Sequence, residues 1–223
     1  MKKIIITMCM LFMFSMAHAQ VVSIASICQN NSNGLPIDTG AWKTVTGIVT
    51  TANEFGGPAY MQDVTGGIAV FYTEFATAVS IGDSVIVTAK LSQFNGLTEL
   101  VYSTFGGTPS YTIVSSGNPV PPPVVCTIQQ FTTQTWNGHE EYEGRLIRIN
   151  GLTITGTGTF QANTNYTVTD ASGTGQLRID NNTNLETNTE TKTEDKKNRI
   201  CGLFGIELPI IILRKILNIV EVF

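Results

Sequence analysis

The chain has 223 residues, 42% of them hydrophobic, and a formal net charge of −4 from 13 Lys and Arg against 17 Asp and Glu. This length suits one large domain or two small ones. Between Gln20 and Val125 only Lys43 and Lys90 are basic, against six acidic residues, so this half lacks the cations from which strong binding to a phosphate backbone draws its affinity.

Residues 1–19 have the pattern of a secretory signal peptide. Lys2 and Lys3 precede an apolar run from Ile4 to Met16, and Ala17-x-Ala19 offers a cleavage site. The apolar run is shorter than the ~20 residues that a membrane span needs. We therefore expect an exported protein, secreted or at the cell surface, without a stable membrane span.

Residues 20–117 are dominated by β-branched and aromatic runs between turn residues, which is typical of strands. The predicted strands are 43–52, 59–64, 67–73, 81–94 and 97–103. Five strands in close succession favour a small closed barrel, because closure leaves no edge strand to aggregate. The fold class is therefore predicted to be all-β.

The stretch "YMQDVTGGIAVF" places Asp63 and a glycine pair between two strands. Asp accepts hydrogen bonds from backbone N–H groups one or two residues on, and Gly tolerates tight turns. A catalytic Asp would need a partner base or a metal ligand, and none is near in the sequence. The residues assigned to turns on these grounds are Asp63, Gly66, Gly67, Gly82, Asp83, Asp170 and Gly173.

A second, partial copy is predicted at residues 126–185, after a proline-rich linker at 118–125. "YTVTDASGTGQLRI" resembles "YMQDVTGGIAVF", with Asp170 aligned to Asp63 and Gly173 to Gly66. No counterpart of the long strand 81–94 follows it. We expect two tandem five-stranded barrels, the second incomplete.

The C-terminal tail, residues 186–223, changes composition abruptly from a polar run to an apolar end. A reading-frame slip in the gene explains this change best. The alternatives are a linker followed by an apolar helix over Ile210 to Val222, and a membrane anchor. The anchor is the weakest of the three, because Arg214 and Lys215 interrupt the apolar run and Pro209 breaks it.

The chain offers little catalytic chemistry. His139 is the one histidine after the signal peptide, and it stands among Glu140, Glu141 and Glu143. These residues could act as a base or bind a hard cation, but an exposed polar turn fits the pattern better. No glycine-rich phosphate loop with its Lys is present. We expect no metal, no cofactor and no enzymatic activity.

Cys28 and Cys126 could pair in an oxidising compartment, or they could be buried as small hydrophobic residues. The sequence leaves both possibilities open.

The stretch from Gly47 to Leu100, with its "YMQD" and "GGIAVF" hairpin, Ile81-Gly82-Asp83 and "FNGLTEL", resembles the OB-fold repeats of secreted bacterial proteins. Such repeats precede endonuclease/exonuclease/phosphatase or lamin-tail domains. The resemblance covers Val22 to about Tyr111 well, and Tyr142 to about Asn184 in part. It implies a non-catalytic accessory module of a larger extracellular nuclease-type or surface protein, with weak nucleic-acid binding at most. A structural or adhesive spacer, or a glycan-binding module, is the alternative.

OB-folds bind single strands by stacking bases on exposed aromatic side chains. Tyr72 and Phe94, next to polar loops, are the best candidates, with Asn95 and Tyr60 as further ligand-binding candidates. Strand alternation sends about half of the aromatic residues inside, and Tyr60 and Phe71 are expected more often in the core than on the surface. The expected partners are single-stranded nucleic acid or polysaccharide, bound weakly.

Overall fold

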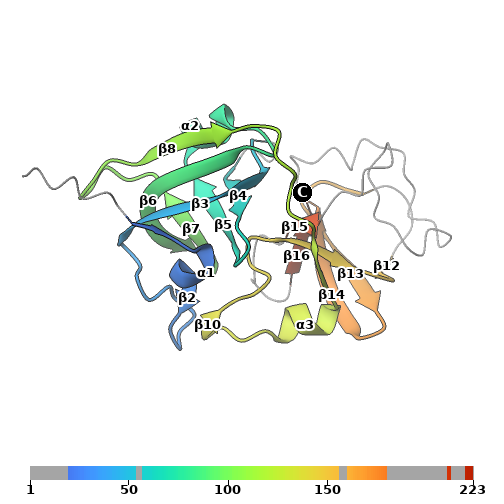
Figure 1. Ribbon diagram of the computed structural model, residues 1–223. Helices are drawn as coiled ribbons and strands as arrows, with labels where there is room; N and C mark the ends of the chain where they lie inside the picture. Colours follow the sequence, from blue (N-terminus) through green and yellow to red (C-terminus); the bar gives the residue numbers. More distant parts are fainter. Residues whose placement is uncertain (1–19, 54–56, 156–159, 180–209, 212–218, 223) are drawn as a thin grey trace, which may run out of the picture.

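The computed structural model describes residues 20–53, 57–155, 160–179, 210–211 and 219–222 (Figure 1). The predicted signal peptide and most of the C-terminal tail lie outside the described residues. Among those described, no helix is long and apolar enough to cross a membrane.

The first unit is a closed barrel, as the strand pattern predicts (Figure 1). Its sheet has the order β1-β3-β4-β5-β7-β6-β8, and an added pairing of β3 with β6 closes the five strands β3, β4, β5, β7 and β6. The bounds are β1 Val21–Val22, β3 Trp42–Thr51, β4 Ala59–Gln62, β5 Gly67–Phe71, β6 Ser84–Phe94, β7 Leu97–Val101 and β8 Ser110–Ser115. The sequence did not predict β8, which pairs antiparallel with β6.

The barrel interior is filled by alternate residues of these strands, because successive side chains of a strand point to opposite faces. Val45, Met61, Val70 and Leu100 are among the fully buried residues of this core. Two short helices, α1 (Ile24–Ile27) and α2 (Thr73–Ala78), add apolar side chains to it, including Phe75. Each such side chain stabilises the fold by roughly 1.5–3 kcal/mol through burial.

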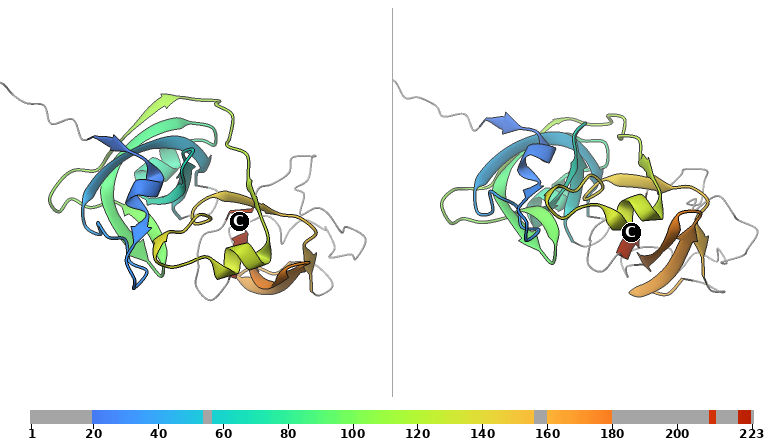
Figure 2. Two further views of the ribbon diagram at one scale, coloured as in Figure 1. Left: turned by 60° about the horizontal axis from the view of Figure 1, so that its bottom comes forward. Right: turned by 90° about the horizontal axis from the view of Figure 1, so that it is seen from below.

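The second unit follows the first in the chain (Figure 2). It has its own apolar core. It contains β9 (Val124–Cys126), α3 (Ile128–Thr133), β10 (Gly138–His139), β11 (Leu146–Ile149), β12 (Thr153–Ile154), β13 (Thr164–Asp170) and β14 (Gly173–Ile179). Strand β9 pairs parallel with β11, as β1 pairs parallel with β3. Over the described residues its strands form separate small sheets, and β10 pairs instead with β2 (Gln29–Asn30) of the first unit.

Two short strands of the tail are described, and both pair with the second unit. Strand β15 (Ile210–Ile211) pairs antiparallel with β11, and β16 (Ile219–Val222) pairs parallel with β14. The suggested apolar helix over Ile210 to Val222 is therefore wrong for these described residues. Isoleucine and valine, which make up most of these residues in the sequence, favour strands.

Candidate ligand-binding surfaces

Asp63 forms the turn between β4 and β5 and also caps a distant helix. Its Oδ1 accepts hydrogen bonds from the Thr65 N–H at 2.7 Å, the Thr65 hydroxyl at 2.6 Å and the Gly66 N–H at 2.9 Å. Its Oδ2 accepts from the Ile24 N–H, the first of helix α1, at 2.9 Å. The Ala25 N–H donates to the Thr65 hydroxyl at 3.1 Å. This carboxylate is thus committed to four structural hydrogen bonds.

Asp170 makes the same set of bonds in the second unit. Its Oδ1 accepts from the N–H of Ser172 at 2.7 Å and of Gly173 at 3.1 Å, and from the Ser172 hydroxyl. Its Oδ2 accepts from the Ile128 N–H at the start of α3 at 2.9 Å. Burial by itself raises the pKa of Asp170, but the bonds from Ser172, Ile128 and Gly173 outweigh it, and the pKa lies below its usual value.

Gly82 and Asp83 lie in the turn that leads into β6. Gly82 has φ +88°, a conformation that glycine adopts without strain. The Asp83 Oδ2 accepts from the Ser80 N–H at 2.8 Å. The Asp83 carbonyl accepts from the Val49 N–H at 2.8 Å, which ties this turn to strand β3.

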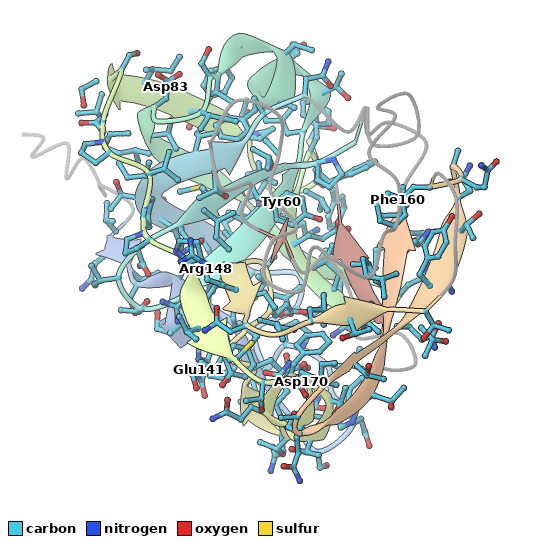
Figure 3. The ribbon with its side chains drawn as sticks, turned by 90° about the vertical axis from the view of Figure 1, so that its right-hand side faces the viewer. Tyr60, Asp83, Glu141, Arg148, Phe160 and Asp170 are labelled. Carbon is cyan, nitrogen blue, oxygen red and sulfur yellow. The ribbon has the colours of Figure 1, made fainter. Side chains whose placement is uncertain are left out.

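Part of the outer face of β4, β5 and β7 is covered by the second unit. Tyr60, Ala69 and Leu97 point out of the barrel and form a separate cluster with Leu146 of β11. The Leu146 N–H donates to the Gln62 Oε1 at 2.8 Å. Tyr60 is only 1% exposed, and Figure 3 shows it where the two units meet. We call these outward residues of β4, β5 and β7 the covered face.

A backbone contact between two glycines brings the units together. A Cβ added to Gly67 would lie 2.1 Å from the Gly144 carbonyl oxygen, and one added to Gly144 would lie 2.8 Å from the Gly67 carbonyl carbon. Gly144 also has φ +66°. Any side chain at either position would force the two backbones apart.

The acidic segment around His139 is part of this interface, so the expected exposed turn is wrong for Glu140 and Glu143. The Glu143 Oε1 accepts from the Thr98 N–H of β7 at 3.0 Å, and the Glu140 Oε1 accepts from the Asn30 Nδ2 at 3.3 Å. Both glutamates are buried, whereas Glu141 is exposed. Their burial follows from docking against residues far away in the sequence.

His139 is half-buried, and its pKa is lowered by burial first and by the positive charge of Arg145 second. An imidazole in this setting stays neutral to lower pH than a free one. In the part of the chain that the structure describes, no group of three or more His, Cys, Asp or Glu could hold a metal ion.

Tyr72 does not have the exposed position expected for a stacking residue. It is buried, with its ring centroid 5.0 Å from that of Tyr102 and 5.9 Å from that of Tyr111. Its hydroxyl donates to the Glu74 Oε2 at 2.9 Å. Burial and this bond raise the pKa of Tyr72 to about 12. The chain turns from β5 into α2 at this residue, which directs the ring inward.

Phe94 and Asn95 lie at the tip of the β6–β7 hairpin. Phe94 is 54% exposed, as predicted. Asn95 has φ +48° and Gly96 has φ +85°, the two left-handed residues of a tight hairpin turn. Tyr60, Tyr72 and Phe94 thus occupy three different environments and form no common platform.

Strand register creates an aromatic row that sequence reasoning missed. Trp42 of β3 lies opposite Lys90 of β6, Lys90 lies opposite Val101 of β7, and Val101 lies beside Phe71 of β5. The Lys90 Nζ is 4.8 Å from the ring centroid of Phe105. We call Trp42, Lys90, Val101, Phe71 and Phe105 the aromatic–lysine row.

Two members of this row are strongly exposed, Phe71 at 54% and Phe105 at 81%. The expectation that Phe71 packs in the core is therefore wrong. It follows the core residue Val70 at the end of β5, and alternation turns its side chain outward. The register joins residues from four strands, and nothing in the local sequence around each one reveals it.

Cys28 and Cys126 are both buried and free, so they form no disulfide with each other in this structure. Burial raises the pKa of the Cys28 thiol well above its usual value and that of Cys126 to about 12. Both thiols are held in the unreactive protonated form.

No family model matches the chain. A stretch of 112 residues, 48% of this chain, is 31% identical to Endonuclease YhcR of Bacillus subtilis, and the match spans only 9% of that endonuclease. A murine DNA-binding protein solved with double-stranded DNA aligns at 14% identity and a TM-score of 0.36, over 61% of this chain and 76% of that one. A replication protein A heterotrimer bound to single-stranded DNA aligns at 11% identity and a TM-score of 0.27, over 61% and 38%. Both scores are too low to establish a common fold.

Proposed function

We propose that this chain is an exported, non-catalytic OB-fold module that serves as an accessory part of a longer extracellular nuclease-type or surface protein and binds single-stranded nucleic acid weakly. The observation that carries the proposal is the closed five-stranded barrel with exposed aromatic side chains on its outer surface. The identity with a short segment of an endonuclease supports the same conclusion.

The second unit is, in this proposal, an incomplete copy of the first. The hydrogen bonds of Asp170 repeat those of Asp63 bond for bond, from the turn residues to the first N–H of the preceding helix. The parallel pairing of β9 with β11 repeats that of β1 with β3. A shared descent of the two units accounts for both likenesses with one assumption.

Binding is expected to be weak because Lys43 and Lys90 are the only cations between Gln20 and Val125. Fluorescence anisotropy of a labelled oligo(dT), titrated with the purified chain at low salt, tests it. We expect saturation with a Kd near or below ~100 µM, in the range of non-specific nucleic-acid binders. A titration that does not saturate at that concentration would refute nucleic-acid binding.

A glycan-binding module is the second candidate, and one observation favours it. Lys43 is paired with the Asp38 Oδ2 at 2.6 Å, and the Lys90 ammonium lies over the Phe105 ring. Both cations therefore have partners within the chain, and an aromatic surface without free charge suits sugar rings. Binding to a polysaccharide that does not change with salt would support this candidate. If the chain binds neither nucleic acid nor polysaccharide, a structural or adhesive spacer remains as the candidate function.

The non-catalytic part of the proposal rests on how the carboxylates are used. Asp63 and Asp170 are each committed to four hydrogen bonds, and His139 sits where two units meet. The test is incubation of the chain with single-stranded DNA and divalent cations. Cleavage that the His139→Ala variant abolishes would show that the chain is an enzyme.

A further inference from the structure

We infer that the ligand of this module contacts the aromatic–lysine row, and that the covered face of β4 and β5 is not the binding surface. This inference rests on the proposed function, because it assigns a site to that binding. In OB-folds generally, the face of the second and third barrel strands binds the oligonucleotide. Here those strands are β4 and β5, so the inference moves the ligand to the adjoining surface, to which these two strands contribute only Phe71 at the end of β5.

The covered face is closed by the chain itself. Its central tyrosine, Tyr60, is 1% exposed and packs against Leu146. The Gln62 side-chain oxygen accepts a hydrogen bond from the Leu146 N–H. At one end of the face, the Gly67 and Gly144 backbones touch with no space for a Cβ. A base has no room to stack there while the second unit stays docked.

The aromatic–lysine row lies on the outer surface beside the covered face. The chain neighbours of its members, Val70, Leu91 and Leu100, belong to the barrel core, so alternation points Phe71, Lys90 and Val101 outward. The row crosses four strands in direct register, which spans roughly 14 Å at the usual strand spacing.

One cation of the first unit belongs to this row. Lys43, the residue after Trp42, pairs with the core residue Ala89 and therefore points to the other face of the sheet, where it bonds Asp38. Lys90 lies opposite Trp42 on the outer face. These residues are far apart in the sequence, and the pairing of β3 with β6 brings them together. Trp42 is held in place by the loop after β7, because a Cβ on Gly107 would lie 2.5 Å from the Trp42 Cε2.

Aromatic rings beside a cation suit a single-stranded nucleic acid. Phe105 and Phe71 are exposed aromatic side chains, on which bases of any sequence can stack. Lys90 can neutralise one phosphate. For a single strand this predicts a slope of log K against log salt of about −0.7, or about a 2.6-fold loss of affinity between 50 and 200 mM salt.

The experiment is an oligo(dT) titration of the full chain and four variants. Phe105→Ala removes an 81% exposed ring of the row, and its control Trp136→Ala removes a 47% exposed ring of the second unit. Lys90→Gln removes a cation of the row, and Arg178→Gln removes one from the second unit as its control. We expect Phe105→Ala to raise the Kd at least about fivefold. We expect Lys90→Gln to reduce the salt slope by about 0.7, with both controls unchanged.

The outcomes separate the site from the function. No binding by the unmodified chain overturns the proposed function and the site with it. If the unmodified chain binds, and Phe105→Ala and Lys90→Gln leave its Kd and salt slope unchanged, the site alone is overturned. A salt slope of zero with affinity for a polysaccharide assigns the row to a sugar ligand and overturns the choice of nucleic acid.

Discussion

Replacing Asp63 by Ala tests whether one carboxylate joins the barrel hairpin to helix α1. The substitution removes the acceptor for four donors at once: two N–H groups and a hydroxyl in the turn, and the Ile24 N–H at the start of the helix. Asp63→Asn is the graded comparison. Asn keeps a carbonyl oxygen that can accept the hydrogen bonds of the turn. Its NH2 group then faces the Ile24 N–H and cannot accept a hydrogen bond from it.

The loss can be worked out from these bonds. Ile24 is fully buried, so its N–H has no access to water after the substitution, which costs about 1–3 kcal/mol. The turn donors are partly exposed and recover part of their loss by hydration. With bonds to a charged group worth about 1.5–3 kcal/mol each, we expect Asp63→Ala to lose about 3–5 kcal/mol of unfolding free energy. Asp63→Asn should lose about 1–2 kcal/mol, the range for a helix cap.

Urea unfolding followed by far-ultraviolet circular dichroism measures these differences from the transition midpoints. Asp170→Ala is the matched variant, because Asp170 makes the same bonds in the second unit. If Asp63→Asn loses nothing, the link to Ile24 contributes nothing; if Asp63→Ala loses no more than Asp63→Asn, the turn bonds that Asn retains contribute nothing. If Asp63→Ala loses less than about 1 kcal/mol, the reasoning from buried hydrogen bonds fails.

Three further predictions concern the interface and the thiols. Gly144→Ala should undock the second unit, because the added Cβ would lie 2.8 Å from the Gly67 carbonyl carbon. Amide hydrogen exchange at Leu146 should then accelerate, while amides of the barrel core keep their protection. Unchanged exchange at Leu146 would contradict the contact. Burial and Arg145 lower the pKa of His139 in the folded chain. The contribution of His139 to the unfolding free energy is therefore complete above the unfolded-state pKa of about 6.5. It falls as the pH drops through 6.5 towards the lower pKa of the folded state. His139→Gln should therefore flatten the loss of urea stability between about pH 7.5 and 5, and an equal loss in both proteins would count against it. Cys28 and Cys126 should resist alkylation at neutral pH until the chain unfolds, as peptide mass spectrometry can show; rapid modification of either one in the folded chain would contradict its burial.

The barrel strands could be predicted because each has one face in the core. The run expected at 43–52 is observed as Trp42–Thr51, and the run expected at 81–94 as Ser84–Phe94 after its Gly-Asp turn. Strand β8 was missed because five of its six residues are exposed. A strand that buries neither face leaves no alternation in the sequence.

The site was harder to predict because it depends on contacts between distant residues. Tyr60 alternates outward, as an exposed stacking residue would, and only the docking of Leu146 buries it. Trp42 and Lys90 become neighbours only through the register of β3 and β6. Alternation along one strand predicts which way a side chain points, but it does not predict which distant residues cover that side chain.

The two copies of the Asp turn show how docking changes the requirement at one position. Gly66 and Gly173 take equivalent places after Asp63 and Asp170. A Cβ on Gly66 would lie 3.2 Å from the His139 Nε2, whereas a Cβ on Gly173 would meet nothing within 4 Å. Neither glycine has a positive φ, so the turn itself does not demand glycine at either place. The first copy needs the small residue because His139 of the second unit and Ile24 of helix α1, whose Cγ2 would lie 3.2 Å from the added Cβ, both pack on it. Among the described residues nothing packs on the second copy in that way, so its turn keeps an open surface where the first has an interface.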